Sequence, residues 1–134
     1  MSIAIYNIFL RRSSIGLEVI DIVHLVLNAL AAKKAQDTLV LDLQGLTVIA
    51  DYFVIATASS PVNSRAMVDA VLEDARNMGI KGVQPEGLGE SSWVLIDFGD
   101  VIVHVFDAEH RDFYQLERLW ADAPRVPIPE EYRT

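Results

Sequence analysis

The sequence contains no cysteine, which excludes disulfide bonds, thiolate metal sites and thiol nucleophiles. It also lacks an apolar run of the roughly 18 to 20 residues that a membrane-spanning helix requires. Asp21 and His24 interrupt the most apolar stretch. The apolar residues 1–10 precede Arg11 and Arg12, which reverses the order of charge and apolar core in a secretory signal. We therefore expect a protein of the cytoplasm that makes no use of a membrane.

Basic residues are scarce, because 11 Lys and Arg oppose 19 Asp and Glu and leave a formal net charge of −8. A protein that binds nucleic acid directly needs an excess of basic over acidic residues, since it must neutralise phosphates. The charge favours a basic protein partner instead, because opposite fields steer the encounter of two surfaces. We expect no direct, sequence-specific contact with nucleic acid.

With 134 residues, 51% of them apolar, the chain can bury one α/β core and has no room for two. The apolar spacing of residues 17–34 predicts an amphipathic helix. Ser60 and Pro61 are typical of a helix N-terminus and Gly79 of a helix end, so they bound a second long helix. Asp107 can cap a last helix, on which three apolar residues share one face: Phe113, Leu116 and Trp120.

Short runs of β-branched and aromatic residues predict strands at 38–43 and 52–57, and a further short strand near Val83. Gly87-Leu88-Gly89 is a glycine-rich turn without the lysine of a phosphate loop. Residues 92–97 and 100–106 flank Phe98-Gly99, a two-residue turn in which glycine can take positive φ. This pattern predicts an antiparallel hairpin.

The register of this hairpin predicts which side chains share a face. It pairs Asp97 with Asp100, Leu95 with Ile102 and Trp93 with His104. The opposite face is aliphatic and suits a core under the two long helices: Val94, Ile96, Val101, Val103 and Val105. The first face mixes a tryptophan, aliphatic residues, a histidine and carboxylates, which favours a partner surface anchored by Trp93. The alternative is that the C-terminal segment of the chain covers Trp93.

Catalytic and metal-binding patterns are weak. No histidine-pair spacing typical of a metal site occurs among His104, Asp107 and His110. Asp97 and Asp100 flank a turn and could hold Mg²⁺, but facing carboxylates there are more often solvated or turned to a partner. We expect no metal, no cofactor and no catalytic residue.

Three segments resemble the Iojap or ribosomal silencing factor family. They read DLQGLTVIADYFVIATASS over residues 42–60, EGLGESSWVLIDFGDVIVHVF over 86–106 and RDFYQLERLWADA over 111–123. The resemblance places the family domain at residues 17–123, with an N-terminal extension at 1–16 and a proline-containing tail at 124–134. One departure is Ala58, where the family usually has glycine after the second strand.

The resemblance implies a single domain with a mixed β-sheet and helices packed on it, nucleotidyltransferase-like in shape. Nucleotidyltransferases need a Gly-Ser pair followed by two metal-binding aspartates. Here Ala58-Ser59 is followed by residues 61–63 without such a pair, so the catalytic metal site is missing.

The resemblance also implies a partner, the large ribosomal subunit through large-subunit ribosomal protein fourteen. Binding there would block joining of the small subunit and repress translation when nutrients are scarce. Two alternatives stay open, a large-subunit maturation factor and a divergent nucleotidyltransferase-like enzyme, and a homodimer is not excluded. The predicted partner-binding residues are Trp93, Leu95, Asp97, Asp100, Ile102, His104 and Tyr52.

Overall fold

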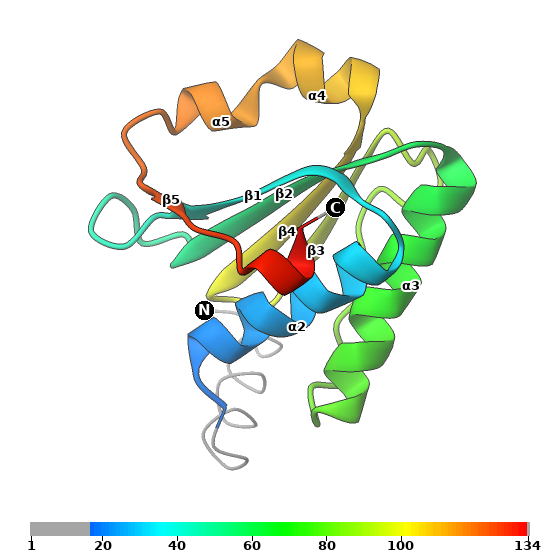
Figure 1. Ribbon diagram of the computed structural model, residues 1–134, viewed down its shortest axis with the longest axis horizontal. Coiled ribbons are helices and arrows are strands. Elements are labelled where there is room, and N and C mark those ends of the chain that lie inside the picture. The colour runs from blue at the N-terminus through cyan, green and yellow to red at the C-terminus, as the bar shows by residue number, and fades with distance from the viewer. Residues whose placement is uncertain (1–16, 134) are drawn as a thin grey trace.

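The computed structural model describes residues 17–133, so the extension predicted at 1–16 lies outside the described residues. These residues form three layers, with a five-stranded sheet between two helical layers (Figure 1). Helices α2, Val19–Ala32, and α3, Pro61–Asn77, cover one face. The shorter helices α4, Ala108–Tyr114, and α5, Leu116–Leu119, lie over the other.

The sheet has the strand order β3-β4-β2-β1-β5. Only the central pair, β2 and β4, is parallel, while every other pair is antiparallel. The prediction of one α/β domain with a mixed sheet is therefore confirmed. The strands are β1, Gln36–Asp42, β2, Tyr52–Ala58, β3, Trp93–Asp97, β4, Val101–Asp107, and β5, Arg125–Val126.

The ends of the two long helices follow the signals in the sequence. At the start of α2, the Asp21 carboxylate accepts a hydrogen bond from the Glu18 backbone N–H at 2.8 Å. At the start of α3, Ser60 Oγ accepts one from the Asn63 backbone N–H at 3.0 Å, and a proline follows as the first helical residue. Gly79, with φ of +89°, ends α3. Both predicted helices are confirmed, to within two residues at most ends.

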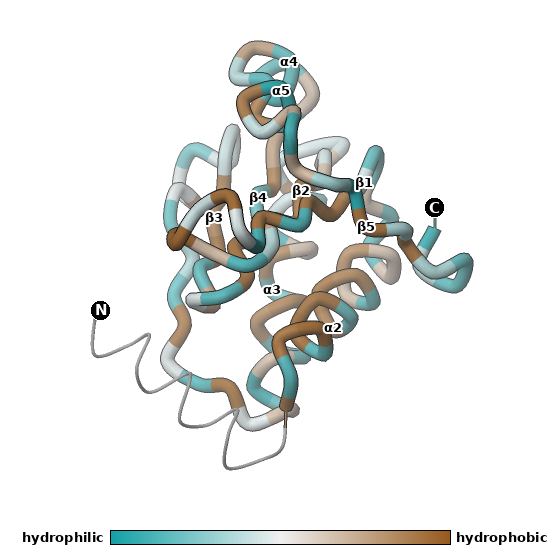
Figure 2. Tube along the Cα trace, turned by 90° about the vertical axis from the view of Figure 1, so that its left-hand side faces the viewer, coloured by the Kyte–Doolittle hydropathy of each residue, from teal (hydrophilic) through white to brown (hydrophobic). Residues whose placement is uncertain are grey.

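The aliphatic face of the β3–β4 hairpin packs under α2 and α3, as predicted. Its five members are fully buried in one cluster with the inner faces of both helices: Val94, Ile96, Val101, Val103 and Val105. Figure 2 shows hydrophobic segments of the sheet and of α2 and α3 facing one another. This side of the sheet is the main hydrophobic core.

The hairpin register differs from the predicted one by two residues. Asp97 pairs with Ile102, Leu95 with His104 and Trp93 with Phe106. Phe98 is not in the turn; its backbone N–H donates to the Val101 carbonyl at 2.9 Å and its side chain is fully buried. Burying a phenylalanine outweighs placing it in a solvated turn, so Gly99-Asp100 forms the loop. A shift of two residues leaves each side chain on its predicted face.

Two further predictions need correction. Residues 80–85 form no strand, and the nearest pairing is an isolated bridge between Glu86 and Leu95. The last helix begins at its Asp107 cap as predicted, but it breaks at Gln115, whose φ of +47° is left-handed. The break separates Phe113, which is 76% exposed, from Leu116, which packs on the sheet. Leu116 and Trp120 therefore pack against the same cluster, and Phe113 does not share their face.

The proline-containing tail is extended at β5, where it adds an antiparallel edge strand beside β1. A short 3-10 helix, Glu130–Tyr132, follows and returns to α2, where the rings of Tyr132 and His24 lie 6.1 Å apart. Within residues 17–133 no helix combines the length and the apolar character that crossing a membrane needs.

Candidate partner-binding face

Alternate residues of the edge strand β3 form a row on the side of the sheet that faces away from α2 and α3. We call Trp93, Leu95 and Asp97 the β3 row. All three side chains are half-buried, whereas the intervening Val94 and Ile96 are fully buried. The row is therefore a surface feature whose backbone is anchored by the core.

The indole of Trp93 is held from two directions. Its Nε1–H donates a hydrogen bond to His104 Nδ1 at 3.1 Å, and its ring stacks on Phe106 with centroids 4.9 Å apart. Tyr114, at the end of α4, lies on the same indole with a centroid distance of 4.9 Å. The C-terminal segment thus covers Trp93 in part, and the remaining indole surface stays open to a partner.

Ile102 and His104 share this face but do not lie at the surface, which corrects the expectation that they contact a partner directly. Ile102 is 8% exposed and His104 is 3% exposed. Ile102 belongs to a second apolar cluster between the sheet and the α4–α5 layer, together with Phe53 and Phe106. The buried ring of His104 contacts this cluster edge-on at Phe53. Trp120 closes this cluster, edge-on to Phe53 at 5.9 Å. The two residues lie beside the β3 row, on the adjacent strand β4.

Burial sets the charge state of His104. Desolvation disfavours the imidazolium and lowers the pKa of His104 to about 4. The ring is therefore neutral at pH 7, which agrees with its acceptance of a hydrogen bond from the Trp93 indole N–H. Its Nε2 has no hydrogen-bond partner among the described residues.

The carboxylates predicted for the partner face lie at the hairpin end of the sheet. Asp97 Oδ1 accepts a hydrogen bond from the Gly99 backbone N–H at 2.7 Å, so this side chain also stabilises the turn. Asp100 lies in the turn and outside the row. Its carbonyl accepts from the backbone N–H groups of Asp51 and Tyr52, at 2.8 and 3.0 Å. These bonds tie the hairpin to the start of β2.

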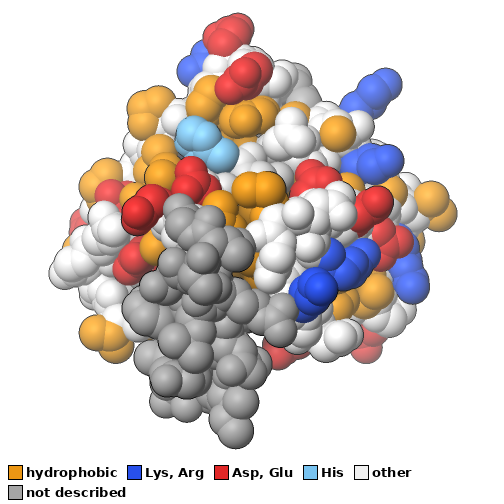
Figure 3. Space-filling view, turned by 90° about the horizontal axis from the view of Figure 1, so that it is seen from below, with side chains coloured by type: hydrophobic (Ala, Val, Ile, Leu, Met, Phe, Trp, Pro, Cys, Tyr) orange, Lys and Arg blue, Asp and Glu red, His pale blue; other side chains and the backbone are white. Residues whose placement is uncertain are grey.

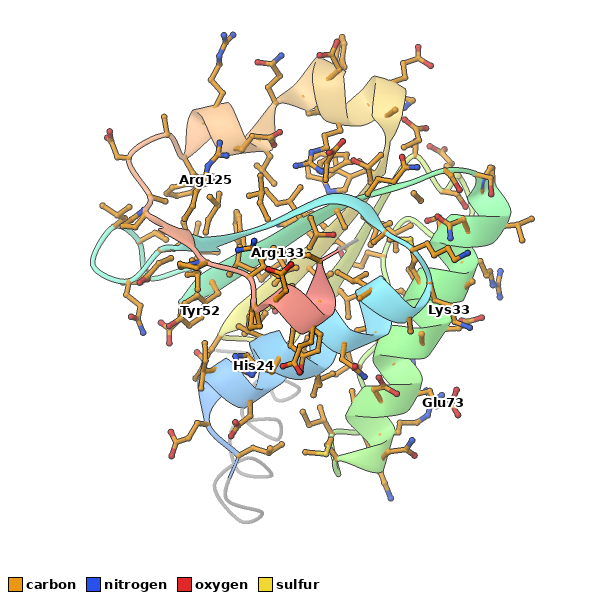
Figure 4. All side chains as sticks on the ribbon, in the orientation of Figure 1. His24, Lys33, Tyr52, Glu73, Arg125 and Arg133 are labelled. Carbon is orange, nitrogen blue, oxygen red and sulfur yellow. The ribbon has the colours of Figure 1, made fainter. Side chains whose placement is uncertain are left out.

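Tyr52 lies on the other side of the sheet from the β3 row. Its side chain packs against the main core under α2, because its strand neighbour Phe53 takes the opposite face. Figure 4 places Tyr52 on the side of the sheet where α2 lies. Burial, followed by the charges of Asp42 and Asp51, raises the pKa of the Tyr52 hydroxyl. A single partner patch therefore does not join Tyr52 to Trp93.

An arginine that the sequence reasoning missed holds the α4–α5 layer on the sheet. Arg111 is 11% exposed; its Nε lies 3.3 Å from Glu117 Oε1 and one terminal nitrogen donates to Thr57 Oγ1 at 2.9 Å. The same nitrogen donates to the Asp37 carbonyl. These groups line a cavity of about 580 Å³ between α4–α5 and the start of β1. No local pattern signals such a contact, because 74 residues separate Arg111 from Asp37.

Exposed hydrophobic side chains gather in two places outside the core. One is the β1–β2 loop, and the other is the α4–α5 segment beside Trp93; the residues are Leu46, Val48, Ile49, Phe113, Tyr114 and Leu119. The face seen from below in Figure 3, by contrast, mixes charges of both signs with hydrophobic and uncharged atoms. Among residues 17–133 no three His, Asp or Glu side chains are grouped to hold a metal ion.

Comparison with known proteins places the chain in a family. The family model described as "Ribosomal silencing factor during starvation" matches residues 17–134. The chain is 42% identical to ribosomal silencing factor RsfS of Bacillus subtilis over 96 residues, 72% of this chain and 81% of that protein. It is 39% identical to RsfS of Halalkalibacterium halodurans over 108 residues, 81% and 92% of the two chains.

The fold is also shared with solved structures. A crystal structure of a protein from Chromobacterium violaceum superposes with a TM-score of 0.75 at 32% identity, covering 85% of this chain and 92% of that one. A crystal structure from Bacillus halodurans gives 0.71 at 35% identity, with 81% and 98% covered. The chain belongs to the ribosomal silencing factor family.

Proposed function

We propose that this protein is a cytoplasmic, non-enzymatic silencing factor that binds the large ribosomal subunit through large-subunit ribosomal protein fourteen. Bound there, it occupies the surface where the small subunit docks and so represses translation under nutrient limitation. Steric occlusion needs a stable interface and no chemical step. The proposal extends the family membership to a partner and a mechanism.

The observation that carries this proposal is the β3 row. A half-buried tryptophan, an aliphatic residue and a carboxylate stand side by side on a strand whose alternate residues are locked in the core. Interfaces concentrate their binding energy in such aromatic anchors, surrounded by groups that exclude water. The exposed rings of Phe113 and Tyr114 continue the surface beyond Trp93.

Charge supports a basic protein as the partner. The net charge of −8 favours encounter with a positive surface and opposes direct contact with ribosomal RNA. Asp97 and Asp100 place carboxylates at the hairpin end of the row. Rim charges of this kind mainly raise the association rate, so binding should weaken as salt increases.

The direct test is subunit joining. Purified protein should co-sediment with isolated large subunits and not with small ones, and it should lower the yield of joined ribosomes from separated subunits. Unchanged joining at saturating protein would refute silencing. Earlier association with immature large subunits in cells would favour a maturation factor, which would use the same residues.

Variants of the row separate binding from folding. Trp93→Ala should weaken binding to protein fourteen by roughly 30- to 1,000-fold, or about 2 to 4 kcal/mol. It should also lower stability, because the indole stacks on Phe106 and contacts the ring of Tyr114. Val94→Ala is the matched control: it should cost about 1 to 3 kcal/mol of stability and leave the affinity of the folded protein near normal. A folded Trp93→Ala that binds normally would contradict the proposal.

The charge of Asp97 needs a variant that keeps the turn. Asp97→Asn retains an oxygen to accept from the Gly99 N–H and removes only the charge, whereas Asp97→Lys loses the hydrogen bond and reverses the charge. Both changes should slow association with protein fourteen, Asp97→Lys more than Asp97→Asn. The difference between the association rates of the two variants should shrink at high salt. An association rate that neither change affects would place the partner elsewhere.

A further inference from the structure

The ring of His104 lies beside the β3 row, on the adjacent strand β4, and is buried. Phe53 contacts it edge-on with centroids 4.6 Å apart, and Phe106 stacks parallel to it at 6.4 Å. Across the strands it is flanked by Leu95 and by Ile55, its register partner on β2. Apart from the indole nitrogen of Trp93, these neighbours are apolar or aromatic, which is an unusual place for an imidazole.

The hydrogen bond fixes the tautomer of this ring. Trp93 Nε1 can only donate, so His104 Nδ1 must accept, and the proton of the neutral imidazole must sit on Nε2. Nε2 is buried and has no hydrogen-bond partner within the described residues. An unsatisfied buried donor destabilises a fold. A phenylalanine would fill the same space without that penalty.

We propose that His104 is a positioning residue for partner binding, which uses Nδ1 to hold the Trp93 indole in the orientation that a partner recognises. This inference rests on the proposed function, because it assumes that Trp93 is the anchor. Without the acceptor, rotation about the two side-chain torsions of Trp93 has no polar restraint. Part of the binding free energy would then go into ordering the indole.

The geometry of the row explains why such a restraint is needed. Trp93 is the first residue of β3 and the strand lies at the sheet edge, so one side of the indole has no neighbouring strand. Phe106 stacks on the indole, and the second aromatic neighbour, Tyr114, is itself about half exposed. Among residues 17–133, the Nε1–Nδ1 bond is the only hydrogen bond of the indole.

Binding of purified protein fourteen to His104→Phe and His104→Asn tests the proposal. The asparagine variant keeps an acceptor at the Nδ1 position, and the phenylalanine variant removes it. His104→Phe should weaken affinity about 10-fold, equal to ~1.4 kcal/mol, with an unchanged or raised melting temperature. His104→Asn should remain within about 3-fold of the wild type, and so should Ile55→Val, a buried neighbour on the same face.

A double-mutant cycle shows whether the effect passes through the indole. In a Trp93→Phe background, which has no Nε1–H, His104→Phe should cause no further loss. Wild-type affinity for His104→Phe, or the same 10-fold loss in the Trp93→Phe background, would overturn the proposal. If the affinity falls in parallel with the melting temperature in both His104 variants, His104 acts only as a core residue and the proposal is wrong.

Nitrogen NMR of the unbound wild-type protein provides a readout that does not depend on partner binding. We expect the Nε2–H tautomer for His104 and slow solvent exchange of the Trp93 indole N–H, assigned with Trp93→Phe. A Nδ1–H tautomer would refute the hydrogen bond on which the inference depends. If wild-type protein does not bind protein fourteen, the proposed function fails, while the tautomer and the indole exchange still decide whether His104 holds Trp93.

Discussion

Acid should destabilise this protein through His104, and the size of the effect follows from its burial. The pKa of His104 falls from 6.5 to about 4 in the folded state. Between these values the unfolded chain binds a proton that the folded chain does not, so the free energy of unfolding decreases as pH falls through this window. At pH values above 6.5 both states are neutral and the contribution is fully present.

A pKa difference of one unit between the folded and unfolded states corresponds to about 1.4 kcal/mol, so burial of neutral His104 changes the free energy of unfolding by roughly 3 kcal/mol over the full window. About 2 kcal/mol of that free energy should be lost by pH 5. That loss is large against the roughly 5 to 15 kcal/mol that stabilises a typical domain. Because His104 is 3% exposed, solvent screening does little to reduce it.

Urea unfolding at pH 7 and pH 5 measures the effect, with His104→Asn as the control. The variant cannot titrate at this position and keeps all the carboxylates, so its own pH dependence reports every other group. Wild-type protein should lose about 2 kcal/mol more than the variant between the two pH values. Equal losses in both proteins would show that His104 is not buried in the neutral form, and would refute the reasoning.

Three further predictions concern stability. Gly87→Ala should cost at least about 2 kcal/mol, because φ is +85° and an added Cβ would lie 2.3 Å from the Trp93 carbonyl oxygen; Gly89→Ala, with open space around it, should change unfolding by less than about 0.5 kcal/mol. Ile96→Ala should lower stability by about 2 to 4 kcal/mol in urea unfolding, since its side chain is fully buried in the main core. Arg111→Leu should cost about 2 kcal/mol, because it removes the hydrogen bonds to Thr57 and Asp37 that hold α4–α5 on the sheet and leaves Glu117 without this partner. Amide hydrogen exchange should rise in α4–α5 more than in α3, and a uniform rise would contradict this.

The faces of the hairpin were predictable from the sequence, although its register was not. Side chains alternate along any strand, so Val94 and Ile96 had to share one face and Trp93 and Leu95 the other. The pairing depends on which residues form the turn, and there the burial of Phe98 shifted the register by two. A register shift of two residues leaves each strand side chain on the same face, so the β3 row was predicted correctly although its pairing was not.

The ends of the helix at residues 61–77 were also predictable, because they depend on residues close to them in the sequence. Ser60, Pro61 and Gly79 act within a few residues of themselves, through a capping hydrogen bond, a preset φ and a positive φ. The break at Gln115 had no such signal, since a glutamine in the left-handed region is uncommon and is compensated by contacts elsewhere. Leu116 and Trp120 reach the sheet because the chain turns there.

Exposure at the candidate site depended on segments distant in the chain. Periodicity assigned Trp93, Ile102 and His104 to one face, but it carried no information on what lies above that face. The α4–α5 layer, clamped by Arg111 to groups on β1 and β2, buries Ile102 and His104 and leaves Trp93 half open. Local chemistry and period therefore set the elements and their faces, while long-range packing, which no short window of sequence encodes, chose which of those side chains remain available to a partner.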